Sequence, residues 1–180
     1  MAAASLTKVT LAKILLSPCE RLIMSTRTCL TLAALFGFCA VLLGAFGAHG
    51  LSGRDSRPGF LERKYADTPP KTVAGMEQPA SYKYLQDFQT GVRYQMWHSL
   101  ALFGVGLLMQ QVSSKLLSSA AWCFAGGIML FSGALYVLVI CGPDWLGVKW
   151  GLVAPIGGTL QLLGWMLLAV FCFRYKPTVS

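Results

Sequence analysis

Four long stretches without a formally charged residue constrain most strongly how this chain can fold. They cover residues 28–48, 94–114, 116–143 and 150–173, and so run 21, 21, 28 and 24 residues. A helix needs roughly 20 apolar residues to cross the hydrocarbon core of a bilayer. We therefore expect an all-α membrane protein built as a bundle of four transmembrane helices.

The composition agrees with a chain that lipid surrounds over most of its length. Hydrophobic residues make up 55% of the 180 residues and charged residues only 12%, whereas a soluble domain carries about 25% charged residues. The formal net charge of +8 comes from tails and loops, where Lys and Arg set topology or meet lipid phosphates. No basic helix or aromatic platform stands outside the predicted spans, so we expect no nucleic-acid partner. The six cysteines form no Cys-x-x-Cys pair and therefore predict no metal site.

The first 28 residues differ in character from the rest of the chain. Their charged residues are four cations and a single acid: Lys8, Lys13, Arg21, Arg27 and Glu20. A basic, acid-poor, amphipathic N-terminus resembles a mitochondrial targeting segment. A tail whose positive charges only hold the first helix in place is the alternative.

Residues 29–176 form the predicted membrane domain. Its helices are expected at about 29–48, 88–110, 117–140 and 153–173, with a polar loop over 53–87. The second helix begins in water near Ser81 and enters the membrane after Arg93. A Cys-Gly-Pro-Asp sequence stops the third helix, and Pro155 suits the first turn of the fourth.

Four crossings place both chain termini on the same side of the membrane. Lys and Arg number 7 on that side and 8 on the other. This near tie leaves the basic N-terminus to favour the matrix side. Four cations on the terminal side form a candidate site for an anionic lipid headgroup such as that of cardiolipin: Arg27, Lys115, Arg174 and Lys176. Charges that only set the topology are the alternative.

Few residues in the spans carry reactive side chains. None of the four stretches contains an Asp or Glu, which ion-coupled transporters usually need. His49 and His98 are predicted near one membrane face, where two imidazoles could ligate a haem or a metal ion. Close-packed helices rich in glycine argue against a porphyrin cavity, so we expect no haem, no metal and backbone-bonded histidines. Polar residues of the last two helices, such as Gln161, are interpreted as inter-helix hydrogen-bonding groups.

Four stretches of the chain, in order, look like the motifs of one family. They are a Leu-Gly-Ala-Phe-Gly-Ala-His-Gly-Leu run at 43–51, a Tyr-Gln-Met-Trp-His run within 90–102, residues 131–136, and residues 154–165. Together they resemble the transmembrane protein 256 family, four-helix membrane proteins of unknown function with bacterial inner-membrane homologues. The motif residues, which we interpret as structural, are Gly44, Gly47, His49, Gly50, Tyr94, Gln95, His98, Ser132, Gly133, Tyr136, Pro155, Gly157, Gly158 and Trp165.

The resemblance implies a four-helix bundle and, with this N-terminus, the mitochondrial inner membrane, but it brings no established activity. Our hypothesis is a non-catalytic accessory subunit of a mitochondrial inner-membrane complex of the respiratory chain. Its partners would be membrane lipids and the other subunits. The alternatives are a small-solute transporter or channel, a lipid-binding protein, and a redox protein that binds haem through His49 and His98.

Overall fold

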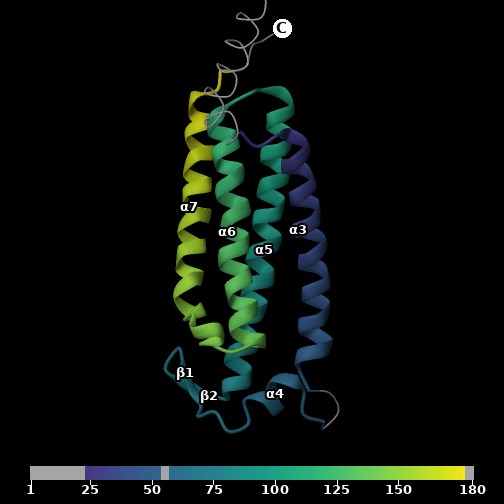
Figure 1. Cartoon of the computed structure of the whole chain (residues 1–180), viewed down its shortest axis with the longest axis vertical. Helices are drawn as coiled ribbons and strands as arrows, with labels where there is room; N and C mark the ends of the chain where they lie inside the picture. The colour runs from purple at the N-terminus through teal and green to yellow at the C-terminus, as the bar shows by residue number, and fades with distance from the viewer. Residues whose placement is uncertain (1–22, 54–56, 177–180) are drawn as a thin grey trace, which may run out of the picture.

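The described residues form four long helices, which lie side by side in an elongated bundle (Figure 1). This computed structural model describes residues 23–53 and 57–176, so most of the predicted N-terminal extension lies outside the described residues. The long helices are α3 (Thr26–Phe46), α5 (Ala80–Gln111), α6 (Lys115–Ile140) and α7 (Trp150–Arg174). Shorter elements connect them: η1 (Gly47–Leu51), α4 (Phe60–Lys64), β1 (Lys71–Val73), β2 (Met76–Gln78) and η2 (Trp145–Gly147).

The long helices are ordered α3, α5, α6 and α7 across the bundle, and each packs on the next (Figure 1). α3 and α7 therefore occupy opposite edges. α7 also reaches α5 through Trp165, whose indole N–H bonds to His98. Because α5 and α7 both pack on α6, the face of α6 between them forms the floor of a groove.

Both ends of the described chain lie at one end of the bundle. The Met24 backbone N–H donates to Ser118 Oγ at 2.7 Å, and the Thr26 hydroxyl donates to the Met109 carbonyl at 3.3 Å. These bonds tie the start of α3 to the end of α5 and the start of α6. Phe171, near the end of α7, packs into the same apolar cluster as Met24. We call this the terminal end and the opposite one the loop end.

Within the described residues, three helices are long and apolar enough to cross a bilayer. They are Thr26–Leu51, Lys115–Ile140 and Trp150–Arg174. The 26 residues of α6 extend about 39 Å, beyond the roughly 30 Å of the hydrocarbon core. α5 is less apolar because Gln95, His98 and Ser99 interrupt its hydrophobic half. The protein is thus a multi-pass helical membrane protein with three clear candidate spans, where the sequence predicted four.

The turn between α6 and α7 depends on Gly142. α6 ends at Ile140, and Gly142 follows with φ of 122° while its N–H bonds the Val137 carbonyl at 3.2 Å. α7 then begins at Trp150, so Pro155 lies inside the helix and not in its first turn as predicted. The helix can start before the predicted position because Pro155 lies close to the helix start and removes only one backbone hydrogen bond there.

The predicted polar loop is folded onto the loop end of the bundle. The Tyr65 hydroxyl donates to the Val139 carbonyl at 3.0 Å, and the Lys64 ammonium donates to the Ile140 carbonyl. These are carbonyls at the end of α6 that have no partner within a helix. The Tyr65 ring stacks on Tyr84 with 4.1 Å between centroids. Burial, reinforced by Tyr84, raises the pKa of Tyr65 to about 12.

A short hairpin completes this loop. β1 and β2 pair antiparallel, with Val73 opposite Met76. Ala74 and Gly75 between them both have positive φ, 51° and 80°, as a type I′ turn requires. The loop is therefore an ordered cap over residues 57–79, and α5 follows it directly at Ala80, one residue before the start that the sequence predicts near Ser81.

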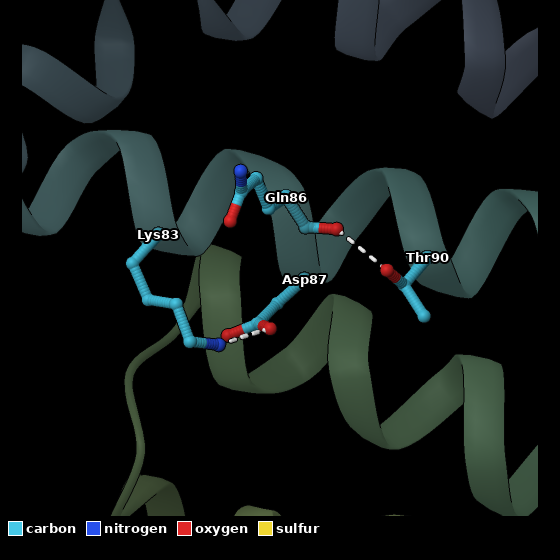
Figure 2. Close-up of polar contacts among 4 residues, drawn as sticks. All are labelled: Lys83, Gln86, Asp87 and Thr90. Carbon is cyan, nitrogen blue, oxygen red and sulfur yellow. Dashed lines mark hydrogen bonds and ion pairs between the residues drawn. The ribbon is translucent and has the colours of Figure 1, made fainter. Parts of the chain in front are cut away.

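The first turns of α5 carry the charges that precede its apolar part. Figure 2 shows the Lys83 ammonium turned toward the Asp87 carboxylate one turn later, forming a partly exposed ion pair. The Thr90 hydroxyl donates to the Gln86 carbonyl at 2.9 Å in the next turn. Arg93 is also exposed, and beyond it α5 has no further charged residue. The helix thus passes from a polar to an apolar half near residue 93.

Candidate functional site

Gln95 lies at the centre of a hydrogen-bonded network that joins three helices. Its side chain is 4% exposed. Its Nε2 donates to the Phe36 carbonyl of α3 at 2.8 Å, and its Oε1 accepts from the Tyr136 hydroxyl of α6 at 2.9 Å. An unpaired amide is costly in an apolar interior, so these bonds fix the positions of α3 and α6 relative to α5.

Two buried serines extend this network. The Ser132 hydroxyl donates across the α5–α6 interface to the Gly91 carbonyl at 2.8 Å. The Ser99 hydroxyl donates to the Gln95 carbonyl at 2.6 Å. Gly91 lacks a side chain at the point where a Cβ would lie 2.9 Å from the Tyr136 ring. The network therefore depends on a close approach of α5 and α6 as well as on its polar groups.

His98 faces away from this network, toward α6 and α7. The Trp165 indole N–H donates to His98 Nε2 at 3.3 Å, and His98 Nδ1 lies 2.8 Å from the Tyr94 carbonyl. An indole nitrogen can only donate, so Nε2 accepts and the imidazole proton is on Nδ1, where it bonds Tyr94. Both ring nitrogens are thus used, which fixes the tautomer and the ring orientation.

A groove opens beside this pair, between α5 and α7 and over α6. Its volume is about 520 Å³, within the roughly 300–1,000 Å³ of small-molecule sites. Aromatic side chains form much of its wall: the Tyr94 ring lies 5.3 Å from Trp97 and 5.0 Å from Phe131, centroid to centroid. Pro155, Gly158 and Trp165 contribute the α7 side. Five of the predicted motif residues therefore border one groove.

Gln161 borders the same groove and differs from the other polar residues there. It is 3% exposed, and its Nε2 is buried without a hydrogen-bond partner in the described part of the chain. By contrast, the Thr159 hydroxyl beside it donates to the Pro155 carbonyl at 2.9 Å. Gln161 packs against α6 at Gly127, where a Cβ would lie 2.6 Å from its Cγ. The groove wall thus contains a buried donor that residues 23–53 and 57–176 do not satisfy.

The predicted motif glycines separate into close contacts and open positions. A Cβ on Gly157 would lie 2.2 Å from the Phe131 backbone nitrogen, and one on Gly47 would lie 3.0 Å from the Phe88 ring. A Cβ on Gly44 would lie 3.4 Å from Val92, and one on Gly50 would lie 2.7 Å from the ring of Phe46, the last residue of α3. A Cβ on Gly158 would make ordinary contacts, and one on Gly133 would meet no neighbouring described atom within 4 Å. Close packing therefore explains some of these glycines and not Gly133.

Residues 43–158 match the model of a family described as a protein of unknown function, DUF423. The chain belongs to the DUF423 family. It is 35% identical to the UPF0382 membrane protein YwdK of Bacillus subtilis over 80% of its length and 94% of the relative. It is 38% identical to a UPF0382 membrane protein of Haemophilus influenzae over 82% and 94%, and 35% identical to the UPF0382 inner membrane protein YgdD of Escherichia coli over 85% and 95%. No solved structure matches the chain.

The DUF423 match begins near the end of α3 and stops within α7. It includes Gln95, His98 and Gly157, and so contains the polar network and much of the groove. Gln161 and Trp165 lie just beyond it. The relatives are named as membrane proteins of a bacterial family, which agrees with the sequence resemblance to a family with bacterial inner-membrane members.

The two histidines of this DUF423 chain are not brought together. His49 is exposed in η1 at the loop end, on the same short element as Gly47, which meets Phe88. His98 follows Phe88 by ten residues, about 15 Å along α5, and faces α7. The close approach of the two imidazoles that the haem alternative requires, and that the sequence left open, is therefore not formed. In the described part of the chain, no group of three or more His, Cys, Asp or Glu residues is placed to hold a metal ion.

The four candidate headgroup cations do share one end of the bundle. Arg27 lies in the first turn of α3, Lys115 begins α6, and Arg174 ends α7 with Lys176 just beyond. All four side chains are exposed. They surround the terminal end, where phosphate groups of a surrounding bilayer would lie.

Gln161 is the groove residue whose role the sequence did not predict. The polar residues of the last two helices were predicted to form inter-helix hydrogen bonds, and Ser132 and Tyr136 of α6 do so. The position of Gln161 beside Trp165 could have been predicted, because the two residues are four apart in one helix and therefore share a face. The missing partner was not predictable, since it depends on how α6 and α7 pack.

Proposed function

We propose that the protein is a non-catalytic accessory subunit with four membrane spans. The complex to which it belongs would be a respiratory-chain complex of the mitochondrial inner membrane. Its role would be structural: a rigid bundle that holds neighbouring subunits and lipids in place. The proposal combines the basic N-terminal segment with membership of a membrane-protein family and with the way the buried polar residues are used.

The chain direction supports α5 as the fourth crossing. α3 begins at the terminal end and η1 finishes at the loop end, whereas α6 begins at the terminal end again (Figure 1). If α3 and α6 both cross the membrane, the chain between them must cross back. α5 is the long helix in that segment, and its uncharged part after Arg93 covers about 27 Å over residues 94–111.

The hydrogen bonds between buried polar groups are the main support for a structural role. Gln95, Tyr136 and Ser132 bond to one another's helices, and both nitrogens of His98 are engaged. Side chains that serve catalysis or conduction must remain free for a substrate or for water. Groups held in this way instead specify one arrangement of helices, which is what a scaffolding subunit requires.

The capped loop end supports an assembly role from outside the membrane. Tyr65 and Lys64 hold the cap on the end of α6, so the 57–79 surface is presented in one conformation. A preformed surface loses less conformational freedom when a partner binds. The transporter alternative draws no such support, because large side chains such as Phe88, Leu102 and Phe124 fill the helix interfaces and are 0% exposed.

Native gel electrophoresis of digitonin-solubilised mitochondria tests the assembly role. We expect the protein to migrate in a complex much larger than its 19.5 kDa, and to move to the monomer position after treatment with dodecyl sulfate. Migration as a free monomer in digitonin would contradict the proposal. When mitochondria are fractionated, the protein should be found in the inner membrane and should remain there after carbonate extraction.

Cysteine labelling tests the fourth crossing separately. Thr72→Cys lies in the cap and Ser113→Cys lies between α5 and α6, both at exposed positions. In a background without native cysteines, a membrane-impermeant maleimide should label only one of the two from a given side. Labelling of both from the same side would show that α5 does not cross, whatever the complex.

A further inference from the structure

We propose that the groove between α5 and α7 binds a lipid-soluble carbonyl compound of the quinone class, with the Gln161 amide as the hydrogen-bond donor. This inference concerns a ligand and does not rest on the accessory role proposed above. It rests on four features of the groove: an unpaired buried donor, its depth, the aromatic wall and the lateral opening.

The unpaired donor indicates that the occupant carries a hydrogen-bond acceptor. Gln161 is 3% exposed, and its Nε2 has no hydrogen-bond partner among the described residues. A buried donor without a partner is costly, and most are satisfied by protein, water or ligand. The last torsion of a glutamine side chain is soft, so the amide can turn toward the groove without movement of α7. An acceptor oxygen in the groove would then satisfy it.

The depth of Gln161 distinguishes between sources of that oxygen. It is the twelfth of the 25 residues of α7, about 16 Å from the helix start. The ester carbonyls of a phospholipid lie at the edge of the hydrocarbon core, roughly 15 Å from its centre. An acceptor that reaches the middle of α7 must therefore belong to a molecule whose polar group enters the hydrocarbon core. Isoprenoid quinones are molecules of this kind.

The wall of the groove fits a flat ring. Tyr94 lies 5.0 Å from Phe131 and 5.3 Å from Trp97, and Trp165 crosses His98 edge to face at 6.3 Å. Aromatic pairs at such distances prefer offset-stacked or edge-to-face arrangements, and a planar quinone ring can join either. Gly158 has no side chain to occupy the groove on the α7 side, where a Cβ would lie 3.6 Å from the Phe131 ring.

The groove opens sideways, which is the route that a membrane-dissolved ligand needs. Trp97 and Trp165, which line it, are 53% and 47% exposed, and Leu162, which also lines it, is 72% exposed. Because α5 and α7 are separated by α6, the opening faces the lipid. A ligand with a long apolar tail can thus place its ring in the groove and leave the tail among acyl chains.

Tryptophan fluorescence provides the test, because Trp97 and Trp165 line the groove and quinones quench indole emission. The full-length protein is reconstituted in phosphatidylcholine vesicles and titrated with a decyl-substituted benzoquinone. Decylbenzene, which has the same tail and no carbonyl, is titrated as a competitor. Gln161→Leu removes the donor and Gly158→Leu fills the groove. Met166→Leu is the matched control on the same helix, since Met166 is 58% exposed and outside the groove.

We expect saturable quenching for the wild type and for Met166→Leu, superimposed on weak collisional quenching. Loss of one hydrogen bond should weaken binding about fivefold in Gln161→Leu, and Gly158→Leu should abolish saturation. In the infrared difference spectrum, the quinone carbonyl stretch should shift to lower frequency with the wild type but not with Gln161→Leu. Infrared spectra in the amide I region establish that each variant retains its helices.

Three results would overturn the proposal. The first is quenching that never saturates, which would mean that no site exists. The second is equal affinity of wild type and Gln161→Leu together with competition by decylbenzene, which would identify an apolar slot for acyl chains. The third is an unshifted carbonyl band with the wild type, which would leave water as the partner of Gln161. None of these outcomes bears on the complex in which the protein migrates.

Discussion

Replacing Gly157 with alanine tests the tightest part of the α6–α7 contact. A Cβ at this position would lie 2.2 Å from the Phe131 nitrogen and 2.7 Å from the Leu130 carbonyl carbon. Both atoms belong to the backbone of α6, so no side chain can rotate out of the way. Restoring an ordinary contact of 3.4 Å requires the two helices to separate locally by about 1 Å.

The size of the effect follows from two opposing terms. Overpacking a well-packed interface typically costs about 1–3 kcal/mol, whereas alanine favours a helix over glycine by about 0.5–1 kcal/mol. Gly157→Ala should therefore destabilise the bundle by about 1–2 kcal/mol. Gly158→Ala makes the same chemical change one residue later and meets only the Phe131 ring, at 3.6 Å. It should leave stability unchanged or raise it by about 0.5 kcal/mol.

Thermal unfolding in dodecyl maltoside, followed by tryptophan fluorescence, measures both variants against the wild type. A change of 1 kcal/mol shifts the midpoint by about 2–4 °C in a chain of this size. The midpoint of Gly157→Ala should fall by several degrees and that of Gly158→Ala should not. Equal midpoints for the two variants would refute the backbone contact between α6 and α7.

Three further changes test other parts of the bundle. Tyr136→Phe removes one inter-helix hydrogen bond and should cost about 0.6 kcal/mol. Gln95→Leu removes both inter-helix bonds of the amide and leaves the Tyr136 hydroxyl without its acceptor, so it should cost about 1–3 kcal/mol; the same unfolding assay separates the two variants. Gly142→Ala should destabilise by about 1–2 kcal/mol because Gly142 has φ of 122°, and an unchanged midpoint would contradict that turn. Because the pKa of Tyr65 is raised to about 12, the folded state holds its phenolic proton more tightly than the unfolded state. The resulting stability is fully present below pH 10 and is lost as the pH rises toward 12; unfolding midpoints between pH 8 and 11.5 should show this loss for wild type and not for Tyr65→Phe.

The apolar helices could be predicted from the sequence because length and hydropathy are local properties. α3, α6 and α7 lie in three of the charge-free stretches. The start of α7 was less predictable, since the proline rule identifies only where a helix tolerates Pro155. The run of α5 from Ala80 through Gln111 agrees with the predicted start in water near Ser81 and the predicted end near residue 110.

Contacts between helices were much less predictable than the helices themselves. The sequence identified Gln95 and Tyr136 as polar residues in spans, but their pairing depends on the rotation and relative height of α5 and α6. The same limit left open whether His49 and His98 approach each other. Placing two residues near one membrane face says nothing about which neighbour each helix turns them toward, and His98 turns toward Trp165.

The contrast between two buried glutamines separates the roles of the two sides of α5. Gln95 and Gln161 are 4% and 3% exposed, so each must find partners inside the membrane domain. Gln95 finds them for both amide atoms, on α3 and α6, and thereby makes that side of α5 a fixed interface. Gln161 leaves its donor unpaired beside an open groove on the other side. Since one chain satisfies the first amide fully, the second is better explained by a partner that the chain itself does not supply.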